Sequence, residues 1–233
     1  MLRAMRYTAL LLDLDHTLLD SDASEALAFE HALASAGVVD PARHLPAYNQ
    51  INRALWAQVE RGEITTAHLR TARFAQLLDA SQIDASPTAL ADAFTHGLGA
   101  YGDLYPGVRD VLDALAAEPT ISLALVTNGL SDVVRARIAR LDLARYFRAI
   151  AISSELGTAK PAPAIFEHAL TGLGSPARHA ALVVGDSLSS DIQGGRNAGL
   201  ATCWYNPQRR PGGDSLVDHE IATHEALLAL VRP

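Results

Sequence analysis

The feature that most constrains this 233-residue chain is a short apolar run near its start that ends in two aspartates. Residues 7–12 are almost entirely apolar, and Asp13 and Asp15 follow directly. A continuous apolar run of this length is typical of a parallel strand that is buried on both faces. The sequence therefore predicts a central strand that brings two carboxylates to the carboxyl edge of a sheet.

The segment after Pro106-Gly107 alternates between strand and helix patterns. Strands are expected at residues 121–126, 149–152, 180–185 and 200–204, with helices between them and a last helix, capped by Thr223, that reaches Val231. Such alternation is typical of βαβ units. We therefore expect an α/β fold with a doubly wound, open parallel sheet, which is a Rossmann-like core.

Residues 21–100 show one helical pattern after another and no strand signal. Thr65 is placed to cap one of these helices, and Ser86-Pro87 to open another. We expect two domains: a Rossmann-like catalytic core formed by residues 1–20 and 101–233, and a helical domain formed by residues 21–100.

Composition narrows the possible partners and the location. The formal charge of −7 provides no basic field for a nucleic-acid backbone, so polymeric nucleic acid is not an expected partner. Cys203 is the only cysteine, which favours a reducing compartment. No apolar stretch resembles a signal peptide or a membrane span. We expect a cytoplasmic protein that is a monomer or a homodimer and does not contact membranes.

Polar residues with chemical potential follow the predicted strands in a fixed order. They are Asp13 and Asp15, then Thr127 and Asn128, then Lys160, and finally Asp186 with Asp191. Because ligands bind at the carboxyl edge of a parallel sheet, these residues are expected to meet there. The clustered carboxylates would repel one another without a cation, and oxygen ligands favour Mg²⁺. Lys160, Thr127 and Asn128 could then hold the oxygens of a phosphoryl group.

Each signal also has a simpler interpretation. Asn128-Gly129 is a common turn, Lys160 could be a solvated residue ahead of a helix that begins at Pro161, and aspartates such as Asp186 and Asp191 are favourable near a helix start. The order of the signals at consecutive strand ends favours a common site. In that site Asp13 could attack phosphorus, and Asp15 could donate the proton that the leaving alcohol needs.

These four clusters resemble the motifs of the haloacid dehalogenase superfamily of phosphohydrolases. The resemblance implies that Asp13 is the nucleophile and that Asp15 is the general acid and then the base. It also implies that Thr127 and Lys160 bind phosphate, and that Mg²⁺ is held by Asp13, Asp186 and the Asp15 carbonyl. Asp191 would ligate the ion or orient Lys160. The helical insert would be a cap domain that closes over the site.

Residues 48–56, 62–74 and 197–204 further resemble the bacterial pyrimidine 5′-nucleotidase branch, the YjjG-type enzymes. This resemblance implies a phosphoric monoester hydrolase that acts on UMP, dUMP, dTMP and noncanonical pyrimidine nucleotides. Arg53, Trp56 and Arg73 are candidate substrate contacts in the insert. Their simpler interpretation is helix packing for Trp56 and solvation for the two arginines.

The sequence is also compatible with two other functions. A phosphatase or phosphomutase of the same superfamily could act on phosphoglycolate or sugar phosphates, because substrate choice depends on the insert. A phospho-signalling or scaffold domain is the non-enzymatic alternative, and the presence of Asp15 argues against it. Asp15 also disfavours dehalogenation, because that branch is not expected to carry a proton-donating aspartate at this position.

Overall fold

The computed structural model describes residues 6–213 and 216–231 and consists of two compact units. The first unit runs to Asp20 and resumes at Asp103, and the second unit is Ser21–Gly102. Each unit has its own hydrophobic core, and each is described by itself below.

The first unit is built on a six-stranded parallel sheet with the strand order β3-β2-β1-β4-β5-β6. The strands are β1 (Ala9–Leu12), β2 (Ser122–Thr127), β3 (Phe147–Ile152), β4 (Ala181–Gly185), β5 (Ala201–Tyr205) and β6 (His219–Ile221). The expected doubly wound parallel sheet is confirmed. β1 lies between β2 and β4, so the strand order reverses beside it, which is where ligands bind in such sheets.

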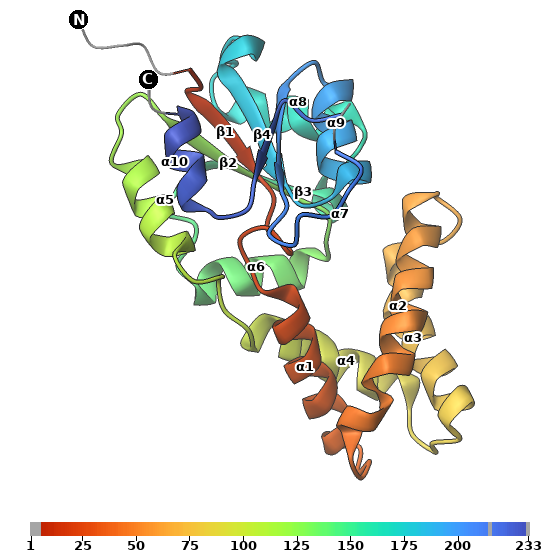
Figure 1. The fold of residues 1–233 in the computed structure, drawn as a ribbon. Coiled ribbons are helices and arrows are strands. Elements are labelled where there is room, and N and C mark those ends of the chain that lie inside the picture. Colours follow the sequence, from red (N-terminus) through yellow and green to blue (C-terminus); the bar gives the residue numbers. More distant parts are fainter. Residues whose placement is uncertain (1–5, 214–215, 232–233) are drawn as a thin grey trace, which may run out of the picture. The chain divides into compact units, whose positions relative to one another are not determined.

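Helices cover both faces of this sheet because the side chains of each strand alternate between the faces. Leu10 and Leu12 belong to one apolar cluster, and Ala9 and Leu11 belong to a second. The first cluster includes residues of α5 (Val108–Ala116), α6 (Ser131–Arg140) and α10 (Glu225–Val231), and the second includes residues of α8 (Pro163–Gly172). Figure 1 shows α5 and α10 on one side of the sheet and α8 on the other. β1 is therefore buried on both faces, as its apolar sequence predicts.

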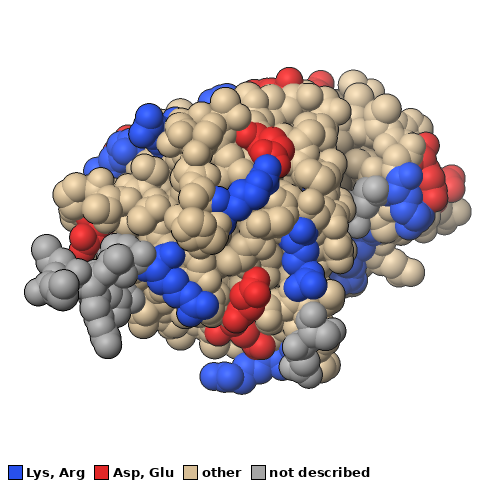
Figure 2. Space-filling view, turned by 90° about the horizontal axis from the view of Figure 1, so that it is seen from above, with Lys and Arg blue, Asp and Glu red and all other residues tan. Residues whose placement is uncertain are grey.

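Short helices complete the first unit. They are α7 (Ser153–Leu156), η2 (Arg178–Ala180), η3 (Leu188–Ile192) and α9 (Gln193–Asn197). On the face seen in Figure 2, acidic and basic side chains are interspersed. Within the described part of the chain, every helix is too short or too polar to cross a membrane.

The second unit consists of helices. They are α1 (Ser21–Ser35), η1 (Pro41–His44), α2 (Leu45–Glu60), α3 (Thr66–Ser81) and α4 (Pro87–Ala100). Thr65 caps α3 by accepting a hydrogen bond from the backbone N–H of His68 at 3.1 Å, and Ser86 caps α4 in the same way. α1 and α4 approach so closely that a Cβ at Gly97 would lie 2.9 Å from the Ala28 Cα.

The core of this helical unit is aromatic. Phe29, Tyr48, Phe74 and Phe94 are fully buried, and their neighbouring rings have centroids 4.7 to 5.7 Å apart. Offset and edge-on ring pairs of this kind stabilise a core beyond the apolar area that they bury. The unit therefore has enough internal packing to hold the polar side chains that it also buries.

Candidate active site

Three of the sequence-predicted carboxylates meet at the carboxyl edge of the sheet. Asp13 follows β1 and Asp186 follows β4, and the two strands are paired in register up to Leu12 and Val184. Asp191 lies in η3, just beyond Asp186. One oxygen of each of the three carboxylates lies within 4.8 Å of the others.

Lys160 lies among these carboxylates and is 4% exposed. Its Nζ donates hydrogen bonds to Asp13 Oδ1, to Asp191 Oδ1 at 2.7 Å, and to the carbonyl of Val126 at 3.0 Å. Burial alone would lower the pKa of Lys160, but the carboxylates of Asp13 and Asp191 raise it above its ordinary value. The Lys160 ammonium group is therefore a fixed positive charge beside the carboxyl end of β2.

The charge balance of the cluster fits a divalent cation. Burial raises the pKa of Asp13 although Lys160 opposes the shift, and burial followed by the charge of Asp13 raises the pKa of Asp186 to about 6. Burial also raises the pKa of Asp191. Lys160 lies between Asp13 and Asp191, and Arg210 Nη2 lies 3.8 Å from Asp186 Oδ2. Three carboxylates therefore face two cations and remain short of positive charge. A hard cation with oxygen ligands, such as Mg²⁺, would supply it.

Thr127 is the last residue of β2 and Asn128 follows it, so both lie at the same edge of the sheet. Their surroundings differ. The Thr127 hydroxyl is fully buried and has no hydrogen-bond partner among the described residues. A buried hydroxyl without a partner costs free energy, which a bound ligand oxygen would recover. The Asn128 amide, in contrast, binds both backbone groups of Lys160. Its side chain therefore fixes the lysine, and only Thr127 offers an unused hydroxyl.

Asp15 lies outside the carboxylate cluster formed by the described residues. Its Oδ1 accepts a hydrogen bond from Nη1 of Arg137, on α6, at 2.7 Å. Arg137 is 4% exposed and was not predicted from the sequence. The signal was present, because Arg137 falls on the apolar stripe formed by Val134, Ile138 and Leu141, where a charged residue needs a buried partner.

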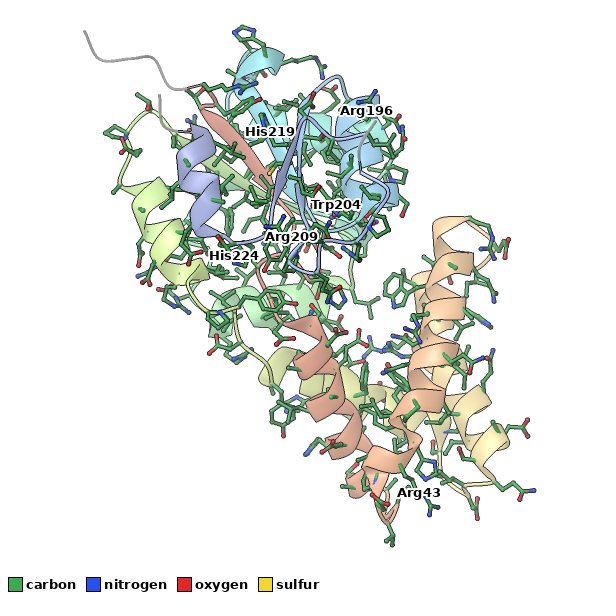
Figure 3. All side chains as sticks on the ribbon, viewed as in Figure 1. Arg43, Arg196, Trp204, Arg209, His219 and His224 are labelled. Carbon is green, nitrogen blue, oxygen red and sulfur yellow. The ribbon has the colours of Figure 1, made fainter. Side chains whose placement is uncertain are left out.

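The backbone of Asp186 is held by side chains that sequence reasoning also missed. Its N–H donates to Thr17 Oγ1 at 3.0 Å, and its carbonyl accepts from Trp204 Nε1 at 2.8 Å and from Arg210 at 3.0 Å. Trp204 lies on β5 and is labelled in Figure 3. These contacts fix the backbone of Asp186 at the carboxyl end of β4.

The candidate substrate contacts of the helical unit differ in exposure. Arg53 is exposed on α2, Trp56 is partly buried one turn further along, and Arg73 on α3 is 2% exposed. Nη1 of Arg73 donates to Asn52 Oδ1 at 3.4 Å, and its guanidinium carbon lies 4.4 Å from the ring centre of Phe94. Nε and Nη2 of Arg73 have no hydrogen-bond partner among the described residues. Asn52 Nδ2 in turn donates to Glu25 Oε2 at 3.2 Å, so Arg73, Asn52 and Glu25 form a polar group against the aromatic core.

The strand order and the residues at the carboxyl edge define a Rossmann-like α/β protein with a buried acidic cluster. The chain belongs to the haloacid dehalogenase-like hydrolases, because that family matches residues 7–199. It is 37% identical to the pyrimidine 5′-nucleotidase PynA of Streptococcus pneumoniae over 203 residues, which are 87% of this chain and 85% of PynA. It is 34% identical to the pyrimidine 5′-nucleotidase YjjG of Escherichia coli over 206 residues, which are 88% of this chain and 89% of YjjG.

A solved structure is also similar. The putative HAD-hydrolase YfnB from Bacillus subtilis, solved with bound magnesium, matches with a TM-score of 0.89 and 31% identity, and the match covers 98% of this chain and 100% of YfnB. These similarities confirm the superfamily and the enzyme class expected from the sequence.

Proposed function

We propose that this hydrolase releases phosphate from pyrimidine 5′-nucleoside monophosphates in a Mg²⁺-dependent reaction. The observation that carries the proposal is the buried group of Asp13, Lys160 and Asp191, together with a buried Thr127 hydroxyl that has no hydrogen-bond partner among the described residues. The substrate class is supported by the names of two relatives that the chain covers over most of their length.

The reaction would proceed in two displacements at Asp13. In the first, a carboxylate oxygen of Asp13 forms a bond to phosphorus while the bond from phosphorus to the ester oxygen breaks, and Asp15 gives a proton to the leaving alcohol. In the second, water attacks phosphorus in the aspartyl-phosphate, Asp15 takes a proton from that water, and the P–O bond to Asp13 breaks. Phosphate leaves, and both aspartates return to their starting states.

The other residues of the core unit would hold the phosphoryl group in place. Lys160 and the Thr127 hydroxyl would bind its oxygens, and the Asn128 side chain would keep Lys160 in position. Asp13, Asp186 and the Asp15 carbonyl would bind Mg²⁺, with Asp191 as a further ligand or as the partner that orients Lys160. When bound, Mg²⁺ would neutralise charge that develops on the phosphoryl oxygens.

The helical unit would act as the cap and select the substrate. Arg53, Trp56 and Arg73 would contact the nucleoside, and Asn52 joins them as a candidate because it accepts a hydrogen bond from Arg73. Nε and Nη2 of Arg73, which have no hydrogen-bond partner among the described residues, would donate to oxygens of the substrate. We further propose that the enzyme works in the cytoplasm as a monomer or a homodimer.

The test is phosphate release from a panel of pyrimidine and purine nucleotides, phosphoglycolate and hexose phosphates, with Mg²⁺ and with a chelator. The wild type should prefer pyrimidine monophosphates and need Mg²⁺, and Asp13→Asn should be inactive. Retained activity in Asp13→Asn would refute the mechanism. Preference for phosphoglycolate or a sugar phosphate, or isomerisation of a sugar phosphate without phosphate release, would refute the substrate assignment. Mg²⁺ binding without turnover would indicate a signalling or scaffold domain.

A further inference from the structure

The two aspartates after β1 are each held by a different cation from a different part of the core. Asp13 is bound by Lys160, and Asp15 is bound by Arg137 on α6. α6 begins at Ser131, just after the end of β2, which supplies Thr127. The helix that follows the phosphate-binding strand thus also reaches the proposed proton donor.

The Arg137 side chain is only 5% exposed, whereas that of Asp15 is 29% exposed. A guanidinium in an apolar helix stripe is costly unless it is paired, and a buried ion pair is often no more stable than an apolar replacement. Fold stability therefore gives little reason for an arginine at this position. A requirement for a fixed direction of the Asp15 carboxyl group gives a better one.

The backbone around Asp15 is also fixed. The N–H groups of Leu18 and Leu19 both donate to the Leu14 carbonyl at 2.9 Å, and His16 donates to Leu19. These bonds close a tight loop in which His16 has a φ of 59°. The hydrogen bond from Arg137 to Oδ1 then restricts rotation of the Asp15 side chain.

We propose that Arg137 is a positioning residue that directs the Asp15 carboxyl group toward the leaving-group oxygen. The inference rests on the proposed function, in which Asp15 transfers the proton. A carboxyl group can accept a hydrogen bond on Oδ1 while it transfers a proton through Oδ2. In this role Arg137 would hold Oδ1, and Oδ2 would transfer the proton. Arg137 would act on the reaction through Asp15 and would not contact the substrate.

The test uses leaving groups that differ in their need for a proton. An alkoxide needs protonation as it leaves, whereas p-nitrophenolate leaves without it. The rate of the first turnover is measured with Mg²⁺ by rapid quench for the alkyl phosphate that the wild type cleaves fastest, and for p-nitrophenyl phosphate. The variants are Arg137→Met, Arg137→Lys, Asp15→Asn and the double variant Asp15→Asn/Arg137→Met. Arg135→Met is the matched control, because Arg135 lies on the same helix but pairs with Glu155 on the surface.

Arg137→Met should slow the first turnover of the alkyl phosphate by about 100-fold, slow that of p-nitrophenyl phosphate only a few-fold, and leave KM unchanged. Arg137→Lys should recover part of the loss, and Arg135→Met should resemble the wild type. The double variant should be no slower than Asp15→Asn, because both changes remove the same proton transfer. Circular dichroism and urea unfolding verify folding, and if Arg137→Met does not fold, Arg137→Lys carries the comparison of the two leaving groups.

Equal losses on both substrates, or additive losses in the double variant, would overturn the positioning role and leave the proposed function intact. If Asp15→Asn itself cleaves the alkyl phosphate at the wild-type rate, the proposed function fails. The two failures are therefore distinguishable.

Discussion

The side-chain amide of Asn128 binds both backbone groups of Lys160. Nδ2 donates to the Lys160 carbonyl at 3.0 Å, and Oδ1 accepts from the Lys160 N–H at 2.9 Å. The two residues are 32 positions apart in the sequence. The end of β2 and the lysine-bearing loop are thus joined directly beside Asp13.

Asn128→Ala should therefore release Lys160 from its position. We expect a loss of about 1 to 3 kcal/mol in the free energy of unfolding, because two partly buried backbone groups lose their partners. We also expect a fall of about 100-fold in kcat, because a misplaced cation no longer meets the phosphoryl group. Urea unfolding and steady-state kinetics measure the two effects. Asn197→Ala is the control, since Asn197 gives the next residue, Pro161, a single hydrogen bond. A wild-type kcat in Asn128→Ala would contradict the positioning role.

Much of the core could be predicted because its signals are local. The apolar run before Asp13 identifies β1, and the polar residues at successive strand ends identify the edge where Asp186 and Lys160 meet. β6 was missed because it has three residues, of which only Ile221 is buried, so no periodicity is visible. The two hydrogen bonds between the Asn128 amide and the Lys160 backbone could not be predicted, because the two residues come together only when the chain folds.

Buried arginines show a second limit of sequence reasoning. Arg137 was not predicted as a site residue although it falls on an apolar helix stripe, and the simpler interpretation of Arg73 from the sequence is a solvated side chain. The structure buries both, at 4% and 2% exposure. The pairing of Arg137 with Asp15 spans 122 positions, so helix periodicity could show a buried charge but not its partner.

The hydroxyl of Thr127 provides a prediction in which stability and function change in opposite directions. Thr127→Val removes a buried hydroxyl that has no partner among the described residues, so the free energy of unfolding should rise by about 1 kcal/mol. Affinity for inorganic phosphate as a product inhibitor should fall by about 10-fold, because one donor to the phosphoryl group is lost. Urea unfolding and inhibition assays measure these effects.

Thr202→Val is the matched control for this change. Thr202 is also fully buried, but its hydroxyl donates to Asp218 Oδ2 at 3.1 Å, so its loss should destabilise the fold. If Thr127→Val is destabilised as much as Thr202→Val, the Thr127 hydroxyl has a structural partner and is not reserved for a ligand.

The raised pKa of Asp186 predicts how stability depends on pH without metal. Burial raises this pKa to about 6, so the folded state binds more protons than the unfolded state between about pH 4 and about pH 6. Stability in the presence of a chelator should therefore fall as pH rises through this window. Asp186→Asn should reduce that fall by about 2 kcal/mol. Urea unfolding at several pH values tests this, with the exposed Asp110→Asn as control. An unchanged pH dependence in Asp186→Asn would refute it.

Addition of Mg²⁺ should restore the stability that is lost when the carboxylates of the cluster ionise. At neutral pH and about 100 times the dissociation constant, the ion should stabilise the wild type by about 3 kcal/mol. Asp186→Asn should lose most of this effect, whereas Asp110→Asn should retain it. Thermal unfolding with Mg²⁺ and with chelator measures the difference. Full stabilisation of Asp186→Asn by Mg²⁺ would show that the ion binds elsewhere.

A substitution of Arg73 tests substrate selection separately from catalysis. Arg73→Met should lower kcat/KM for a pyrimidine monophosphate by about 10-fold or more and leave that for p-nitrophenyl phosphate unchanged, because only the first substrate carries a base. The free energy of unfolding should fall by about 1 to 3 kcal/mol, because the buried Asn52 Oδ1 loses its donor. Arg70→Met, on the same helix, is the control. Equal losses on both substrates would assign Arg73 to packing in the helical unit.

Gly185 provides a test of the Asp191–Lys160 contact that removes no charged group. A Cβ at position 185 would lie 2.2 Å from Asp191 Cγ, which is far inside van der Waals contact, so Asp191 would have to move. The movement would break its 2.7 Å hydrogen bond to Lys160 and free the lysine to shift toward Asp13. We expect Gly185→Ala to lower kcat by about 100-fold. Asp191→Asn should give a similar loss, and the double variant should be no worse than either, because both changes act on one contact. Additive losses would show that Gly185 acts through the strand itself and that Asp191 has a separate role.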